Sequence, residues 1–437
     1  MNKVNVIGLG LAGCEAAYQL AKRGILVEAY EMKPTKFSPA HTSENFAEVV
    51  CSNSFKSDDK STASGCLKAE MRELDCFILK CAEKAKVPAG SALAVDRDKF
   101  SEIVTTELKS MKNVNIHLEE VTKIDLSQPT IIATGPLTSD SLSEELQKLF
   151  GEDNLHFYDA SAPIIDGETI DKSKSFSAGR YGKGESDYIN LPMNKDEYYE
   201  FVDALVSAER VEMHNFEKKE IFEGCMPIEV MASRGRDTLR FGPLRPVGLL
   251  DNEGKKPFAV VQLRRESTES ELYNIVGFQT NLKWGEQQRV FSMIPALKNA
   301  DFVKLGVMHR NSYICSPKHL NYDFSLKSNP LVFVAGQLSG VEGYMESTAS
   351  GLIAGLSMAL KITGKTLAIL PKTTIIGAIT NYLISADEKN FQPMNANFGI
   401  LSPLDKVIRD KSLKKQEYSN RAIRDIREYK ENYDVGI

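Results

Sequence analysis

The chain begins with a hydrophobic segment, a glycine-rich turn and an amphipathic segment that leads into a second hydrophobic one. Residues 4–7 and 25–31 carry the apolar residues typical of strands, and residues 14–22 have the apolar spacing of a helix that ends at Gly24. A helix between two such strands carries the chain back across a sheet, so that the strands pair in parallel. The pattern predicts an α/β fold.

Periodicity along the remaining chain predicts further elements. We expect helices over 66–86, 97–111, 194–210 and 406–430, a short helix over 44–50, and strands over 114–121, 130–133, 238–241, 258–264, 273–279 and 331–335. The polar residues 266–271 predict a hairpin between two of these strands. From about residue 180 the segments become rich in Tyr, Met and Glu. We therefore expect a discontinuous domain of residues 1–180 and 305–437, with an inserted α+β domain over 181–304.

Composition places the chain among globular proteins. Its 437 residues are 42% hydrophobic and 26% charged, which suits two or three soluble domains rather than a disordered chain. The apolar stretch 352–360 is too short to span a bilayer, and no secretory signal is expected at the N-terminus. The net charge of −5 excludes a wholly basic nucleic-acid coat protein but leaves room for a local basic face.

Cysteine usage adds a prediction about compartment. Seven cysteines are present, an odd number, and no two of them have C-x-x-C spacing. We therefore expect neither a disulfide framework nor a metal site, and a reducing cytoplasm is the compartment that this usage suits.

The glycine turn after the first strand has the spacing of a dinucleotide-binding loop. Gly8 permits the tight turn, Gly10 lets the backbone approach a pyrophosphate, and Gly13 lets helix and strand pack closely. The helix N-terminus offers amide N–H groups to the phosphates. Glu31 ends the second strand and can accept hydrogen bonds from both hydroxyls of an adenosine ribose, whereas its charge would repel a 2′-phosphate. FAD or NAD is therefore favoured over NADP.

Two later segments favour FAD over NAD. One strand ends in Thr134 and Gly135, and another opens after residue 335 into a glycine-rich turn and a helix whose N-terminus would stabilise a reduced flavin anion. The cofactor-binding residues expected in that second segment are Gly336, Gly340, Gly343 and Gly351. Together these features predict a Rossmann-like FAD-binding domain of the two-dinucleotide-binding flavoprotein type.

Nine blocks of the sequence are distinctive. They are 8–17 (GLGLAGCEAA), 50–54 (VCSNS), 87–100 (VPAGSALAVDRDKF), 133–138 (ATGPLT), 222–231 (FEGCMPIEVM), 273–289 (YNIVGFQTNLKWGEQQR), 306–311 (GVMHRN), 336–355 and 391–399 (FQPMNANFG). Across nearly the whole chain they resemble the TrmFO family of folate- and FAD-dependent tRNA (uracil-5-)-methyltransferases, and 222–231 and 391–399 are the most specific of them. The shorter block AGCEAA also resembles the GidA tRNA-modifying flavoproteins, which are much longer.

The resemblance implies methylation of uridine C5 in RNA, at the T-loop uridine of tRNA. It implies 5,10-methylenetetrahydrofolate as carbon donor, FAD as methylene carrier and reductant, and NAD(P)H as electron source. The same chemistry on a uridine of 23S ribosomal RNA is a first alternative. An NAD(P)H-dependent flavin oxidoreductase that acts on a small molecule is a second, although simple hydride transfer would not need the two thiols described next.

The resemblance also implies two catalytic cysteines. Cys225 is the nucleophile expected to add to C6 of uracil, because a thiolate both adds to and leaves a soft conjugate acceptor readily. Pro227 suits the first turn of a helix that ends near Gly235, which would place Cys225 just before a helix N-terminus. Cys51 lies in a polar segment and is implied to assist, either as a protecting thiol adduct or in removal of the C5 proton. The other five cysteines are expected to be structural.

RNA binding requires cations and aromatic rings despite the acidic total. The candidates are the basic tail 406–430 and six arginines of the insertion: Arg234, Arg236, Arg240, Arg245, Arg264 and Arg265. Trp284, the only tryptophan, can stack on a base or on folate, but packing inside the protein is the favoured interpretation.

Overall fold

The computed structural model describes residues 3–151, 155–180, 187–211, 226–266, 271–306 and 308–432. Its first part is built on a parallel sheet of five strands in the order β16-β7-β1-β2-β6. The strands are β1 (Lys3–Ile7), β2 (Leu26–Glu31), β6 (Val114–Leu118), β7 (Thr130–Ile132) and β16 (Val332–Val334). The expected parallel α/β sheet is confirmed.

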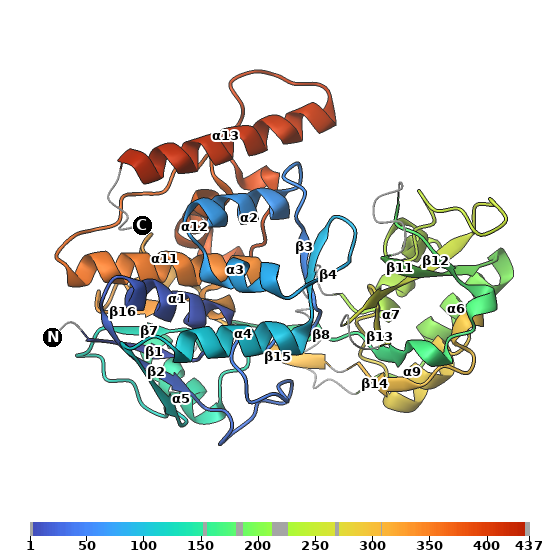
Figure 1. Ribbon diagram of the computed structural model, residues 1–437, viewed down its shortest axis with the longest axis horizontal. Helices are drawn as coiled ribbons and strands as arrows, with labels where there is room; N and C mark the ends of the chain where they lie inside the picture. The colour runs from blue at the N-terminus through green and yellow to red at the C-terminus, as the bar shows by residue number, and fades with distance from the viewer. Residues whose placement is uncertain are drawn as a thin grey trace.

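Helices cover this sheet and extend beyond it (Figure 1). They are α1 (Leu11–Lys22), α2 (Ala63–Glu73), α3 (Phe77–Lys84), α4 (Arg97–Lys109), α5 (Asp140–Phe150), α10 (Ser316–His319), α11 (Tyr344–Ile362), α12 (Ile375–Ser385) and α13 (Lys411–Asn432). A small sheet of β3 (Ser54–Ser57), β5 (Ala92–Val95) and β4 (Lys86–Val87) lies at the edge of this part. One continuous apolar core joins the five-stranded sheet to these helices.

The second part is a mixed layer of strands and helices, drawn in green and yellow in Figure 1. Its sheet has the order β10-β11-β12-β13-β9-β14. The strands are β9 (Ile164–Asp166), β10 (Phe176–Ser177), β11 (Tyr188–Met193), β12 (Ala259–Arg265), β13 (Leu272–Ile275) and β14 (Phe302–Lys304). Its helices are α6 (Lys195–Ser207), α7 (Ile228–Ser233), α8 (Thr238–Phe241) and α9 (Trp284–Phe291). The antiparallel pairing of β12 with β13 confirms the predicted hairpin.

The two faces of this sheet differ in polarity because successive residues of a strand point to opposite sides. On β12, Val261 and Leu263 join the apolar core that the helices complete. Gln262 and Arg264 point to the other side and are buried there as well. A buried polar face therefore belongs to this second part.

The chain crosses between the two parts along an antiparallel ribbon of β8 (Leu155–Ala160) and β15 (Met308–Tyr313). The second sheet begins soon after β8, at β9, and β9 and β10 both precede residue 181. The limit of the insertion expected at 181 therefore moves back to about residue 161, because strand pairing, rather than composition, determines which segments share a core.

Three local predictions are wrong. The helix expected over 66–86 is two helices, α2 and α3, because Asp75 between them has a left-handed backbone with φ of 61°. Residues 238–241 form the short helix α8 rather than a strand, since the turn is closed by a hydrogen bond from Leu244 N–H to the Leu239 carbonyl. Residues 44–50 do not form a helix, because Ala47 has a left-handed backbone with φ of 51°. Of the helices that the structure describes, none is both long enough and apolar enough to cross a membrane.

Candidate active site

A cavity of about 490 Å³ opens at the carboxyl ends of β1, β7 and β16. The helices α1 and α11 both begin at its wall, α1 at Leu11 after Gly10 and α11 at Tyr344 after Gly343. The first four N–H groups of a helix have no acceptor within the helix, and the helix dipole is positive there. The cavity thus has two sites suited to negative charge.

The glycine turn has the geometry that a dinucleotide-binding loop requires. A side chain at Gly13 would place its Cβ 1.8 Å from the carbonyl oxygen of Gly8, so this close approach of turn and helix admits only glycine. A Cβ at Gly10 would meet nothing within 4 Å, and Gly10 lines the cavity. Gly10 is therefore open to a ligand, whereas Gly13 supports the turn from behind.

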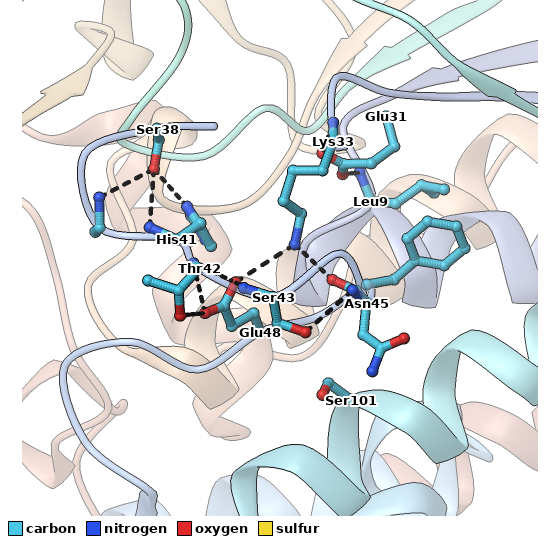
Figure 2. A network of polar contacts seen from close by, with 12 residues as sticks. Leu9, Glu31, Lys33, Ser38, His41, Thr42, Ser43, Asn45, Glu48 and Ser101 are labelled. Carbon is cyan, nitrogen blue, oxygen red and sulfur yellow. Dashed lines mark hydrogen bonds and ion pairs between the residues drawn. The ribbon is translucent and has the colours of Figure 1, made fainter. Parts of the chain in front are cut away.

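Glu31 lies at the far end of the turn and lines the cavity. Its carboxylate accepts hydrogen bonds from the backbone N–H of Leu9 at 3.0 Å and of Lys33 at 3.1 Å. Figure 2 shows that this contact continues into a polar network. The ammonium of the buried Lys33 donates to the carbonyl of Asn45 and lies 3.5 Å from a carboxylate oxygen of Glu48. Glu31 is thus fixed at the position expected for ribose recognition.

Glu48 secures the loop that closes this end of the cavity. Its carboxylate accepts from the N–H groups of Thr42 and Ser43, at 3.0 and 3.1 Å, and from the Thr42 hydroxyl at 3.2 Å (Figure 2). Sequence reasoning missed Lys33 and Glu48, because neither residue belongs to a recognised motif and their partners are several residues away along the chain. A lysine two residues after Glu31, the residue expected to bind the ribose, was the available signal.

The other expected cofactor residues fall into two groups. Thr134, Gly135, Gly336 and Gly343 line the cavity. Gly340 and Gly351 do not line it. A Cβ at Gly340 would lie 2.5 Å from the ring of Phe391, and one at Gly351 would lie 2.2 Å from the carbonyl oxygen of Ala12. These two glycines permit close packing around the site, and Gly351 lets α11 approach α1.

Cys51 lines the cavity and is half-buried. The phenol oxygen of Tyr344, the first residue of α11, accepts from the N–H of Cys51 at 2.9 Å and from that of Ser52 at 3.3 Å. Burial and the neighbouring Cys51 raise the pKa of the Tyr344 phenol well above its usual value, so the phenol stays neutral.

A charged pair that the sequence did not reveal lies on the same side of the cavity. Lys56 and Glu346 both line it, and the Lys56 ammonium is 3.6 Å from the buried Glu346 carboxylate. That carboxylate also accepts from the N–H of Ala396 at 2.9 Å, which ties the C-terminal segment to the first turn of α11.

Cys225 lies outside the described residues, so its position relative to Cys51 stays a prediction. Pro227 does immediately precede α7. Cys14, Cys66, Cys76, Cys81 and Cys315 are buried, in agreement with a structural role. Burial raises the pKa of the Cys14 and Cys76 thiols and that of the Cys81 thiol to about 12, so these three are poor nucleophiles.

The expected RNA-binding residues divide into separate groups. Arg236 and Arg240 lie over the adjacent rings of Tyr199 and Phe258, and most of the basic tail forms α13. Arg264 is buried, and Arg236, Arg240 and Arg265 pair with Asp203, Asp237 and Glu271. The preference for a packed Trp284 is wrong, since 64% of this residue is exposed at the start of α9. Within the described ranges, no group of three or more His, Cys, Asp or Glu side chains is arranged to hold a metal ion.

The residues present fit an FAD molecule. The open positions at Gly10 and Gly135 and the N-terminus of α1 suit a pyrophosphate, and the carboxylate of Glu31 suits a ribose. The N-terminus of α11 suits a ring that carries negative charge. Fold and site define a flavoprotein of the Rossmann-like FAD-binding class.

Comparisons with known proteins define the family. A family model described as glucose inhibited division protein A matches residues 3–366. The methylenetetrahydrofolate–tRNA-(uracil-5-)-methyltransferase TrmFO of Acetivibrio thermocellus is 55% identical over 98% of this chain and 99% of its own. TrmFO of Lactobacillus gasseri is 54% identical over 99% of each chain. The chain therefore belongs to the TrmFO family.

A solved structure supports the fold at a greater evolutionary distance. Aquifex aeolicus GidA superposes with a TM-score of 0.71 at 18% identity, over 98% of this chain and 76% of the GidA chain. At that identity the likeness concerns the fold alone, and it confirms the predicted FAD-binding fold class.

Proposed function

We propose that this protein is an enzyme that methylates uridine C5 in tRNA, at the T-loop position. The overall reaction converts tRNA uridine, 5,10-methylenetetrahydrofolate, NAD(P)H and a proton into 5-methyluridine, tetrahydrofolate and NAD(P)⁺. The single observation that carries the proposal is the identity of 54–55% to relatives named for this reaction, over 98–99% of the chain. The cytoplasm is the compartment in which tRNA and reduced thiols are both available.

The cavity residues hold the cofactor in this proposal. The first-turn amides of α1 bind the pyrophosphate, Glu31 binds the adenosine ribose, and the first-turn amides of α11 stabilise negative charge at the ring end. When bound, FAD supplies the electron transfer that turns a methylene group into a methyl group.

The two cysteines have separate tasks. Cys225 adds to C6 of the uracil, which makes C5 nucleophilic toward the one-carbon unit, and leaves again after C5 has gained that unit and lost its proton. Cys51 works from the cavity wall beside the first turn of α11, where it adds to the one-carbon unit as a protecting thiol adduct or, as a thiolate, takes up the C5 proton. The target base must leave its stack to reach these groups.

Methyl transfer to defined transcripts tests the proposal. Purified protein with FAD, NADPH and labelled methylenetetrahydrofolate should label a tRNA transcript at its T-loop uridine, and a transcript with cytidine at that position should stay unlabelled. Label in a 23S ribosomal RNA fragment but not in tRNA would move the target to ribosomal RNA. Oxidation of NADPH with no label in either RNA would favour a small-molecule oxidoreductase.

A further inference from the structure

The loop that carries Cys51 is held by hydrogen bonds on both sides of the thiol. On its N-terminal side, one guanidinium nitrogen of Arg97 donates to the carbonyl oxygens of Val49 and Val50, at 2.9 Å each. Arg97 is the first residue of α4. The first half of the loop is thus attached to the five-stranded part.

On the C-terminal side of the thiol, Arg264 of β12 provides the attachment. Its Nε donates to the side-chain oxygen of Asn53 at 2.7 Å, and its Nη2 donates to the Ser52 hydroxyl at 2.8 Å. Arg264 is 6% exposed and Asn53 is fully buried, so water cannot easily replace these bonds. The two residues are 211 positions apart in the sequence and join the two parts of the molecule.

The amide nitrogen of Asn53 strengthens this junction. It donates to the carbonyl oxygens of Val95, Arg265 and Glu266, at 3.1, 3.0 and 3.3 Å. Both polar atoms of this buried side chain therefore have partners, and most of those partners belong to β12 or follow it directly.

The Arg97 side of the loop depends on β12 as well. Glu266 follows β12 directly, and its carboxylate receives two hydrogen bonds from the Arg97 guanidinium, at 2.5 and 3.3 Å. Each side of the Cys51 loop is therefore connected to the same strand of the six-stranded sheet, directly through Arg264 or through Arg97 and Glu266. A shift of β12 must move the loop.

We propose that Arg264 and Arg97 are positioning residues, which set the place of the Cys51 thiol in the cavity according to the place of the six-stranded sheet. The inference rests on the proposed function only for the task of Cys51 in methyl transfer. In this arrangement the segment 226–231, which follows Cys225 directly, and the Cys51 loop are both attached to the part of the molecule that contains β12.

Alkylation of Cys51 tests the proposal without any methyl transfer. FAD-loaded wild type and variant are treated with iodoacetamide over a series of pH values, and labelling of each cysteine is followed by peptide mass spectrometry. Arg264→Lys keeps the charge but cannot reach both Asn53 and Ser52. Alkylation of Cys51 should accelerate by about tenfold, the effect of losing one charge-assisted hydrogen bond.

Arg265→Lys is the matched control. It lies on the same strand, but its side chain points to the opposite face, where it pairs with Glu271. In the Arg265→Lys variant, Cys51 should be alkylated at the wild-type rate. In every sample the buried Cys14 and Cys66 should stay unlabelled, which separates a loosened loop from an unfolded protein.

Ser52→Ala removes only the hydroxyl that accepts from Arg264, so it should accelerate the alkylation of Cys51 by less than Arg264→Lys does. If Arg264→Lys also exposes Cys14, and so has partly unfolded, the result with Ser52→Ala decides the question. Methyl transfer by Arg264→Lys should show a lower kcat with an unchanged KM for tRNA. Wild-type rates and pH profiles of Cys51 labelling in both Arg264→Lys and Ser52→Ala would overturn the positioning role. Absence of methyl transfer by the wild type would instead contradict the proposed function, and the alkylation comparison would still stand.

Discussion

The phenol oxygen of Tyr344 lies 2.9 Å from the backbone nitrogen of Cys51 and accepts its hydrogen bond. Tyr344 is also the first residue of α11, whose N-terminus lines the cofactor cavity. One side chain thus connects the start of the helix expected beside the flavin to the loop that carries Cys51, the thiol expected to assist.

Replacing Tyr344 by Phe should therefore impair catalysis more than cofactor binding. The variant leaves the N–H groups of Cys51 and Ser52 without their common acceptor while the ring is kept. We expect kcat for methyl transfer to fall by about tenfold, the effect of losing a buried hydrogen bond. FAD content should match that of the wild type. Tyr322→Phe removes a hydroxyl that bonds the carbonyl of Leu367, away from the cavity, and should leave kcat unchanged.

Gly10→Val should abolish FAD binding without unfolding the chain. A side chain at this position would enter the cavity rather than collide with protein, since nothing lies within 4 Å of its Cβ. The purified variant should lack flavin absorbance but keep the wild-type circular dichroism. Gly285→Val, at a position on α9 with equally open surroundings, should remain yellow. A Gly10→Val protein with wild-type flavin content would place the cofactor elsewhere.

Cys225→Ala should retain FAD but lose the covalent complex with RNA that contains 5-fluorouracil. Fluorine at C5 prevents the proton loss that would release the enzyme thiol, so the wild type should be trapped. Loss of the nucleophile should also lower methyl transfer by about three orders of magnitude or more. Denaturing electrophoresis of labelled RNA measures the complex. If Cys225→Ala forms as much complex as the wild type, the nucleophile is to be sought at Cys51.

The buried Glu70 should make the stability of the protein depend on pH. Its carboxylate accepts from the N–H groups of Ile375 and Ile376 at the start of α12, at 2.7 and 2.9 Å. Burial raises its pKa to about 7. The folded protein therefore holds a proton that the unfolded chain has already lost, so this stabilisation is present at low pH and disappears as the pH rises through 7.

Denaturant unfolding at about pH 5.5 and pH 8 checks this sign. The wild type should lose about 2 kcal/mol more free energy of unfolding between these two values than Glu70→Gln, which cannot ionise. Glu102→Gln, at an exposed position of α4, should keep the wild-type pH dependence. A wild type and a Glu70→Gln variant with parallel pH profiles would show that Glu70 does not titrate in this range.

Local patterns account for what the sequence predicted correctly. The positions of Gly8, Gly13 and Glu31 follow from two strands and the turn and helix between them, and short-range geometry determines all three. The same holds for the hairpin of β12 and β13, whose turn and strands are contiguous. These features need no knowledge of distant segments.

Contacts between distant segments account for the features that the sequence did not predict. Arg264 appeared among candidate RNA-binding residues, but its bond to Asn53 joins positions 211 apart and no spacing rule predicts it. Gly340 and Gly351 have the spacing of flavin-binding glycines, yet their neighbours are Phe391 and Ala12. The exposure of Trp284 likewise depends on how the helix α9 packs against the core of the second part.

The origin of the methyl carbon tests the central claim most directly. The protein is incubated with T-loop tRNA and either methylenetetrahydrofolate labelled in its one-carbon unit or S-adenosylmethionine labelled in its methyl group, each with and without NADPH. Labelled folate should mark the tRNA only when NADPH is present, because methylene must be reduced to methyl, and labelled S-adenosylmethionine should not mark it. Labelling from S-adenosylmethionine at a comparable rate, or equal labelling from folate without any reductant, would contradict a flavin-dependent transfer.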